Sequence, residues 1–143
     1  MRDLILAALV GAAIAGGLMF FMMLPVRDSV SATGRGNSAD RQVTPPDELT
    51  AEATMGERAF NAVCADCHGE RGAGKAGFGP PLIHKIYEPS HHGDAAFHLA
   101  VRNGVRAHHW TFGDMPPQSG LTTADVNTIV AYVREVQRAN GIE

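Results

Sequence analysis

Cys64-Ala65-Asp66-Cys67-His68 places two thiols three positions apart and a histidine directly after the second thiol. Each thiol of such a pair can add to a vinyl group on one edge of a protoporphyrin, and the histidine that follows is then placed to bind the iron. The stretch therefore predicts one covalently attached haem c, held by Cys64 and Cys67, with His68 as the first axial ligand.

Other uses of a CxxC pair fit this sequence less well, because the chain contains only these two cysteines. A structural zinc site needs three or four ligands, usually from a second Cys or His pair at matching spacing, and no such pair follows. A thioredoxin-like redox pair is expected after a strand, within a βαβ pattern that is missing here. A disulfide or a chance pair is the remaining alternative.

The overall charge narrows the choice of partners. A formal net charge of -3 provides no basic patch, so nucleic acid is not expected to bind. Lys75 and Lys85 are the only lysines, which excludes a docking face ringed by lysines. The globular part of the chain, about ninety residues, can bury only a limited core alone, so we expect the haem at its centre.

The N-terminal segment predicts a membrane anchor over residues 1–26. Residues 4–26 carry no charge, and a helix of that length, rising about 1.5 Å per residue, crosses a hydrocarbon core of roughly 30 Å. A secretory signal is the alternative, but its apolar region usually spans roughly 7–15 residues and a small-residue cleavage site should follow. Thioether formation takes place on the side of the membrane away from the cytoplasm. We therefore expect a single-pass membrane protein with its haem domain on that side, which in a bacterium is the periplasmic side of the inner membrane.

Residues 27–49 predict a flexible tether between this anchor and a haem domain over residues 50–143. The segment is rich in Ser, Gly, Asn and Asp, contains Pro45-Pro46 and shows no hydrophobic period. A flexible chain of that length has a root-mean-square span of roughly 25 Å, so the domain could move over a partner while staying near the bilayer.

The haem domain is predicted to be all-α, because no segment alternates with period two. One helix is expected over residues 51–63, with Thr50 as its N-cap. Gly56, Phe60 and Cys64 recur every four positions and so share a face, on which Phe60 would back the haem edge and Gly56 would admit another helix at close range.

Two further helices are expected. One begins near residue 94 and ends at Asn103-Gly104, a C-terminal stop signal. The other begins at residue 122 or 123 and presents Tyr132 as the aromatic to meet Gly56 and Phe60. Its apolar stripe consists of Val126, Ile129, Val130, Val133 and Val136.

Together these features resemble a class I cytochrome c over about residues 50–139. The resemblance rests on the haem motif, the Gly56/Phe60 spacing, the C-terminal helix with Tyr132, and two short elements, Gly79-Pro80-Pro81-Leu82 and Asp114-Met115-Pro116-Pro117. It implies the class I cytochrome c fold around one haem. In that family the first element sets a proline carbonyl against the second nitrogen of the haem histidine, so the Pro80 carbonyl would orient His68 and raise its basicity.

Met115 is the expected sixth ligand of the iron. It lies in a loop rich in Gly and Pro that could lie over the distal haem face, and Pro116 and Pro117 stiffen the chain beyond its sulfur. A thioether favours ferrous iron, so His/Met ligation raises the reduction potential. Two alternatives are a core or surface role for Met115 and a bis-histidine haem of lower potential, with His108 or His109 as ligand.

Histidines are dense between the haem motif and Met115, at positions 84, 91, 92, 98, 108 and 109. The pairs His91-His92 and His108-His109 could bind a second metal, such as copper or zinc, because imidazole suits both ions. The alternative is a set of surface or haem-edge histidines that set a pH dependence near neutrality. Trp110 could donate its indole N–H to a haem propionate, or serve only in packing.

The sequence thus predicts a membrane-tethered, mono-haem electron carrier rather than an enzyme. It would pass single electrons in a respiratory or photosynthetic chain, as a shuttle or as a subunit of an oxidoreductase complex. The expected partners are a donor cytochrome complex and a terminal oxidase, reductase or photosynthetic centre. Alternatives are a small-ligand sensor or peroxidase-like enzyme in which Met115 leaves the iron, and a metal-handling protein that uses the histidine pairs.

Overall fold

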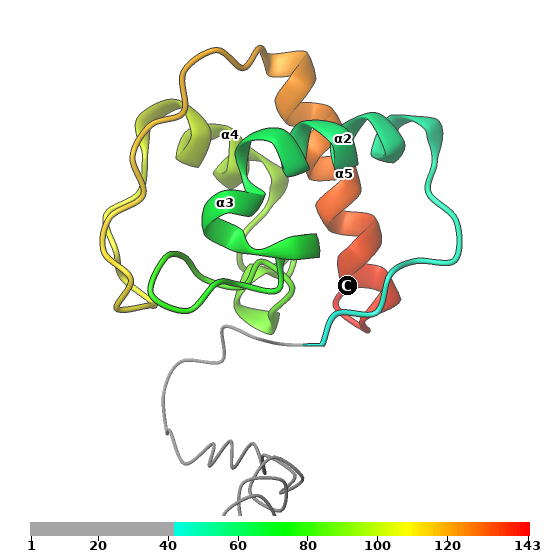
Figure 1. The fold of residues 1–143 in the computed structure, drawn as a ribbon, viewed down its shortest axis with the longest axis horizontal. Coiled ribbons are helices and arrows are strands. Elements are labelled where there is room, and N and C mark those ends of the chain that lie inside the picture. The colour runs from blue at the N-terminus through cyan, green and yellow to red at the C-terminus, as the bar shows by residue number, and fades with distance from the viewer. Residues whose placement is uncertain (1–41) are drawn as a thin grey trace, which may run out of the picture. The chain divides into compact units, whose positions relative to one another are not determined.

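The computed structural model describes residues 42–143 (Figure 1). The predicted anchor and residues 27–41 of the predicted tether lie outside the described residues. Over residues 42–143 the chain forms helices and loops and no strand, with only two isolated bridges, Lys75 with Gly79 and Val105 with Met115. The all-α prediction is confirmed for this part of the chain. None of its helices is both long enough and apolar enough to cross a membrane.

The three predicted helices are present with the expected bounds. Helix α2 spans Ala51–Val63, and its N-cap Thr50 accepts a hydrogen bond from the Ala53 N–H. Helix α4 spans Asp94–Asn103 and ends at Gly104, whose φ of 72° is the left-handed conformation that glycine adopts without strain. Helix α5 spans Thr123–Ala139 and begins with a capping box between Thr122 and Asp125.

Three short helical segments connect them. Helix α3, Ala65–His68, directly follows α2. The 3₁₀ segments η1, Glu70–Gly72, and η2, Lys85–Tyr87, lie in the long connection to α4. In Figure 1, α2 crosses in front of α5, and the loop that follows α4, drawn in yellow, runs along the same side of the view as α4.

The crossing of α2 and α5 depends on the absence of a side chain at Gly56. A Cβ built at Gly56 would lie 1.8 Å from the carbonyl oxygen of Thr128, so the two backbones touch at this point. One turn further along α2, the rings of Phe60 and Tyr132 pack with centroids 5.5 Å apart and planes tilted by 54°. The predicted contact of Tyr132 with Phe60 is confirmed, whereas the close neighbour of Gly56 is the backbone of Thr128.

The hydrophobic core lies along this crossing. Buried apolar side chains from α2, α5 and the connecting segments form one cluster: Val43, Ala53, Phe60, Ile83, Ile129, Tyr132, Val133 and Val136. The valine, isoleucine and phenylalanine side chains among them each contribute roughly 1.5–3 kcal/mol when fully buried. The cluster includes Phe60 of α2, the helix that leads directly into the haem motif.

The end of the predicted tether belongs to the domain, so the prediction of a flexible segment up to residue 49 is wrong for residues 42–49. Val43 is only 9% exposed and joins the core cluster. The Asn140 side chain holds Thr44 through both of its atoms, accepting from the Thr44 N–H at 3.0 Å and donating to its carbonyl at 2.8 Å. A lone buried valine produces no hydrophobic period, which is why the sequence pattern did not reveal this contact.

Candidate haem-binding site

The two cysteines and the histidine of the motif lie on one continuous turn. The Cys64 N–H caps α2 by donating to the Phe60 carbonyl, and the His68 N–H donates to the Cys64 carbonyl at 2.9 Å. The turn ends at Gly69, where φ is 73° and a Cβ would lie 2.2 Å from the Gly74 carbonyl oxygen. Both cysteines are free thiols, and the local backbone holds them and the imidazole in a fixed relative arrangement.

Pro80 orients the His68 ring. The His68 Nδ1 lies 2.9 Å from the Pro80 carbonyl oxygen, and because a carbonyl can only accept, the ring nitrogen donates. Gly79 allows this approach, since a Cβ there would lie 2.6 Å from the Cys67 carbonyl oxygen. The contact that the resemblance implied is therefore present, and it leaves Nε2 as the nitrogen free to bind a metal.

The surroundings of His68 favour its neutral form. Burial lowers the pKa of its imidazole, and the hydrogen bond to Pro80 offsets part of that effect. A neutral imidazole is the form that binds iron. The position is thus suited to an axial ligand.

A cavity of about 430 Å³ lies next to the motif. Cys64, Cys67 and His68 contribute to its wall, and most of its other lining is apolar, with Phe60 and Ile129 from the core side. The volume lies within the range of roughly 300–1,000 Å³ that is usual for cofactor pockets. The cavity therefore fits a haem, both in its volume and in the thiols and the imidazole on its wall.

Met115 lines the same cavity from the loop that follows α4. Two backbone hydrogen bonds of 2.9 Å, one in each direction, pair it with Val105. Gly104 permits this pairing, because a Cβ at that position would lie 2.4 Å from the Met115 carbonyl oxygen. The Asp114 carboxylate stabilises the loop by accepting from the Ala107 N–H at 2.8 Å. The structure therefore brings the sequence-predicted thioether and imidazole to one site.

The Cytochrome c family model matches residues 53–137, which contain the haem motif, the cavity and the Met115 loop. The chain belongs to the cytochrome c family. No curated protein and no solved structure gave a significant match. Membership of the family makes this cytochrome a haem-based electron-transfer protein with covalently bound haem c, which confirms the cofactor predicted from the motif.

The two attachment thiols of this cytochrome differ in their surroundings. Burial raises the pKa of the Cys64 thiol to about 11, with a further contribution from the neighbouring Cys67. Cys67, by contrast, is exposed. With this pKa the Cys64 thiol is protonated at neutral pH, and Cys64 and Cys67 both line the cavity.

Phe60 and Trp110, the two aromatic residues predicted to contact the haem, have different positions. Phe60 is buried and lines the large cavity, as expected. Trp110 lines a smaller cavity of about 50 Å³, and its indole N–H donates to the Tyr87 hydroxyl at 3.1 Å. Its ring also packs edge-on against His84, with centroids 5.2 Å apart. The structure therefore supports the packing alternative for Trp110.

Tyr87 is a site residue that the sequence analysis missed. It lines the large cavity as well as binding Trp110, and burial raises the pKa of its hydroxyl. Its position in η2, far from the haem motif along the chain, carries no recognisable sequence signal. His84 is the N-cap of this same segment, and its ring accepts from the Ile86 N–H and so helps to place Tyr87.

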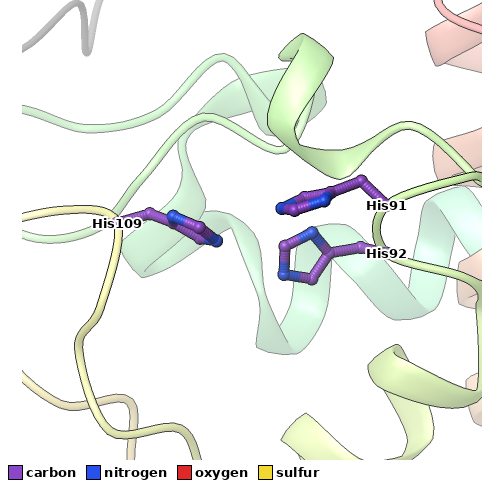
Figure 2. A group of neighbouring side chains, drawn as sticks. All are labelled: His91, His92 and His109. Carbon is purple, nitrogen blue, oxygen red and sulfur yellow. The ribbon is translucent and has the colours of Figure 1, made fainter.

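The two histidine pairs meet at the cavity, where His92 and His108 contribute to the lining. Figure 2 shows how the rings of His91, His92 and His109 lie. His91, His92 and His109 each offer a ring nitrogen, and these atoms all lie within 4.8 Å of one another. His108 lines the large cavity together with Met115, so it is the better placed of the two alternative axial ligands. Desolvation lowers the pKa of His109, and the neighbouring imidazoles of His108, His92 and His91 lower it further. The convergence of the pairs was not predictable from their spacing.

Proposed function

We propose that this cytochrome passes single electrons through a haem c whose iron is bound by His68 and Met115. The observation that carries the proposal is that both side chains line one apolar cavity, while Pro80 holds the second nitrogen of His68. The haem supplies a one-electron couple between ferrous and ferric iron. With both axial positions filled, the iron would offer no open position to a substrate.

Exposed apolar side chains of the cavity lining form a rim. Such a rim supports electron transfer through contact with a partner protein, rather than a reaction on a bound substrate. Phe78 is 62% exposed, and Leu99 and Val63 are also exposed although all three line the cavity. Lys75 lies over Phe78, with its Nζ 4.6 Å from the ring centroid, and donates to the Asp66 carbonyl. Weak contacts between redox partners bury only a small area, and a compact rim of this kind would suit such a contact.

The proposal extends to location and partners. The uncharged stretch over residues 4–26 would anchor the protein in the bacterial inner membrane, with the haem domain in the periplasm. Residues 27–41 would then act as the tether, because residues 42–49 pack on the domain. The partners would be a donor cytochrome complex and a terminal oxidase, reductase or photosynthetic centre, with the cytochrome as a shuttle or a complex subunit.

Met115→Ala tests the axial ligation. We expect the variant to keep its covalent haem, to lose the sulfur-to-iron band at the red end of the ferric spectrum, and to show a lower reduction potential. Met55→Ala is the matched control, because Met55 lies on α2 and is exposed. The control should retain both the band and the potential.

Two outcomes would contradict the proposal. An unchanged band and potential in Met115→Ala would remove Met115 from the iron. Ready uptake of carbon monoxide by the unaltered ferrous protein would show an open or labile sixth position, as in a sensor or peroxidase-like enzyme. If His108→Ala rather than Met115→Ala changed the potential strongly, the bis-histidine alternative would hold, because His108 lines the same cavity.

A further inference from the structure

We propose that His91, His92 and His109 form a second metal site, for a divalent transition-metal ion of the copper and zinc type. Each of the three residues offers one ring nitrogen, and these nitrogens all lie within 4.8 Å of one another (Figure 2). The group contains no thiolate and no carboxylate. Three imidazoles suit copper and zinc, whereas magnesium and calcium prefer oxygen ligands.

The three rings converge from two separate segments. The ring centroids of His91 and His92 are 4.7 Å apart, and the ring of His109 lies 5.5 Å from the first and 5.4 Å from the second. A metal bound at roughly 2.0–2.1 Å needs its nitrogen ligands about 3.3 Å apart in a tetrahedral site. The three nitrogens must therefore approach one another by about 1.5 Å at most. His91 and His109 can make this movement, because their exposed side chains can rotate.

His92 has one ring nitrogen that is free to bind a metal. Its Nδ1 lies 2.6 Å from the Ile86 carbonyl oxygen, so this nitrogen donates and Nε2 carries the free lone pair. A hydrogen bond from the non-ligating nitrogen to a backbone carbonyl is the usual support of a metal-binding histidine. The Tyr87 ring packs against the imidazole, with centroids 5.0 Å apart, and restricts its rotation.

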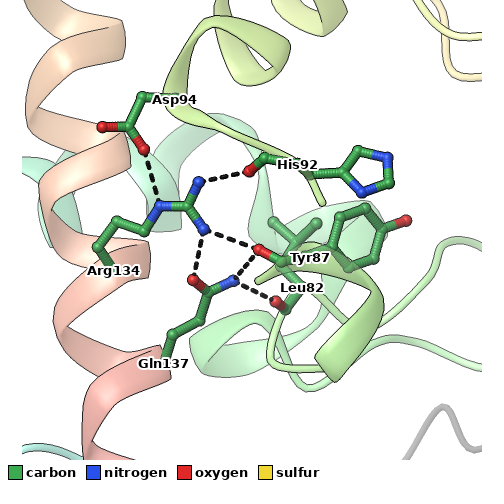
Figure 3. Close-up of polar contacts among 6 residues, drawn as sticks. All are labelled: Leu82, Tyr87, His92, Asp94, Arg134 and Gln137. Carbon is green, nitrogen blue, oxygen red and sulfur yellow. Dashed lines mark hydrogen bonds and ion pairs between the residues drawn. The ribbon is translucent and has the colours of Figure 1, made fainter. Parts of the chain in front are cut away.

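A buried arginine holds the backbone beneath the site (Figure 3). Arg134 is only 7% exposed, and its Nη2 donates to the His92 carbonyl at 2.5 Å. Its Nη1 donates to the Tyr87 carbonyl and to the Gln137 side chain, both at 2.7 Å, and its Nε binds the Asp94 carboxylate at 2.8 Å. The turn that carries His91 and His92 is thus fastened to α5, which reduces the ordering that metal binding would require.

The proposed site is separate from the axial ligands of the haem. His108 is excluded from the group of converging nitrogens, although its ring lies 4.2 Å from that of His109, and its Nδ1 donates to the Arg106 carbonyl at 2.8 Å. Three protein ligands leave a fourth position for water or a small ligand. Neither His68 nor Met115 takes part, so the inference does not depend on the proposed function.

Calorimetric titration of the holoprotein tests the site. At about pH 7.5, where free imidazole is largely neutral, we expect Zn²⁺ and Cu²⁺ each to bind once per chain, with Cu²⁺ the tighter ion and Mg²⁺ without effect. His91→Ala and His109→Ala should each weaken Zn²⁺ binding at least ~10-fold, since loss of a ligand's supporting partner alone costs roughly 10–100-fold. His98→Ala is the matched control, because His98 lies on α4 outside the group.

The haem spectrum provides the accompanying check. Both histidine variants should retain the wild-type spectrum in the visible range, which shows that their haem domains are intact. The inference is overturned if Zn²⁺ does not bind to the wild-type protein, or if His91→Ala and His109→Ala bind it as well as His98→Ala does. It is also overturned if Zn²⁺ binding is abolished by Met115→Ala, because the ion would then occupy the haem site.

Discussion

The Nδ1 of His68 lies 2.9 Å from the carbonyl oxygen of Pro80, so the ring has one nitrogen committed to the backbone and one directed elsewhere. A histidine in the same helical turn as Cys64 could otherwise adopt several rotamers. The hydrogen bond selects one of them, and it depends on the close approach of Gly79 to Cys67. The proposed binding of the iron by His68 therefore depends on Gly79, a residue that has no side chain.

Gly79→Ala is predicted to disturb this arrangement without removing any ligand. The new Cβ would meet the Cys67 carbonyl oxygen at 2.6 Å, so the segment carrying Pro80 must move away from His68. Such overpacking typically costs about 1–3 kcal/mol of unfolding free energy, and a weaker hydrogen bond should also shift the reduction potential. Urea unfolding and potentiometry measure the two effects.

Gly93→Ala is the matched control for that change, since its Cβ would lie 3.6 Å from the Pro89 carbonyl oxygen, an ordinary contact. The control should keep the wild-type potential. Equal potentials in Gly79→Ala and in the wild type would show that the Pro80 contact does not influence the iron.

His68→Ala is predicted to leave little stable holoprotein. The substitution removes the proposed proximal ligand and the hydrogen bond to Pro80 in one step. The yield of covalent haem per chain, measured by absorbance and mass, should fall strongly, while Met115→Ala should keep its haem because both thiols and the proximal ligand are retained. Normal haem content and spectrum in His68→Ala would assign the proximal position to another residue.

Gly56→Ala is predicted to destabilise the fold more than any other exchange of this size on α2. Its Cβ would lie 1.8 Å from the Thr128 carbonyl oxygen, which is backbone and cannot rotate away. The two helices must separate, and we expect a loss of about 3 kcal/mol or more. Ala62→Ser, at an exposed position of the same helix, should change the unfolding free energy by less than about 0.5 kcal/mol. Similar thermal unfolding of both variants would contradict the close crossing.

Arg134 and Asp94 form an ion pair, and we expect the two residues to contribute differently to the free energy of unfolding. Arg134→Met would leave the His92 carbonyl and the Gln137 side-chain oxygen without this donor, and each unpaired buried acceptor costs roughly 1–3 kcal/mol. The Tyr87 carbonyl would keep its hydrogen bond from the Gln137 side chain. Asp94→Asn should cost at most about 1 kcal/mol, because the carboxylate is 65% exposed and the pair is partly screened. Urea unfolding of both variants tests this prediction. Equal losses of unfolding free energy would show that the backbone contacts of Arg134 are not its main contribution to stability.

The capping box at the start of α5 predicts a pH dependence of stability. Hydrogen bonds from the Thr122 side chain, and then from its backbone N–H, lower the pKa of Asp125 below its ordinary value of 3.8. Because the folded-state pKa is the lower one, the stabilisation is present above the unfolded-state value and is lost as the pH falls through the folded-state value.

Asp125→Asn should therefore flatten the fall in unfolding free energy at acid pH. Thr122→Ala should have a similar effect on the pH dependence and cost about 1 kcal/mol near neutrality, because the N-cap is lost as well. Unfolding measured at a series of pH values from neutral to about 2 tests this. A slope at acid pH identical to that of the wild type in both variants would contradict the assignment.

The helices and the haem attachment site were predictable because their signals are local. Thr50, Asn103-Gly104 and Thr122 mark helix ends through hydrogen bonds that span only a few residues. The two cysteines and His68 lie within one turn, so their chemistry follows from their spacing alone. Such features do not depend on how distant segments meet.

The role of Trp110, the burial of Arg134 and the docking of residues 42–49 were not predictable in this way. Thr44 and Asn140, which hold the N-terminal segment, are 96 positions apart. The residues next to Arg134 in the sequence do not distinguish it from an exposed helical arginine. Its burial becomes favourable through acceptors from distant segments, the carbonyls of Tyr87 and His92 and the carboxylate of Asp94.

The haem motif is thus a property of five consecutive residues, whereas the metal site proposed at His91, His92 and His109 exists only in the folded chain. Residues 91–92 and residue 109 belong to segments on either side of α4, and the sequence contains no spacing rule that brings them together. Arg134 fixes the turn that carries His91 and His92, because a buried guanidinium must satisfy its donors with the carbonyls around it. The segment after α4 then brings His109 within reach of that turn.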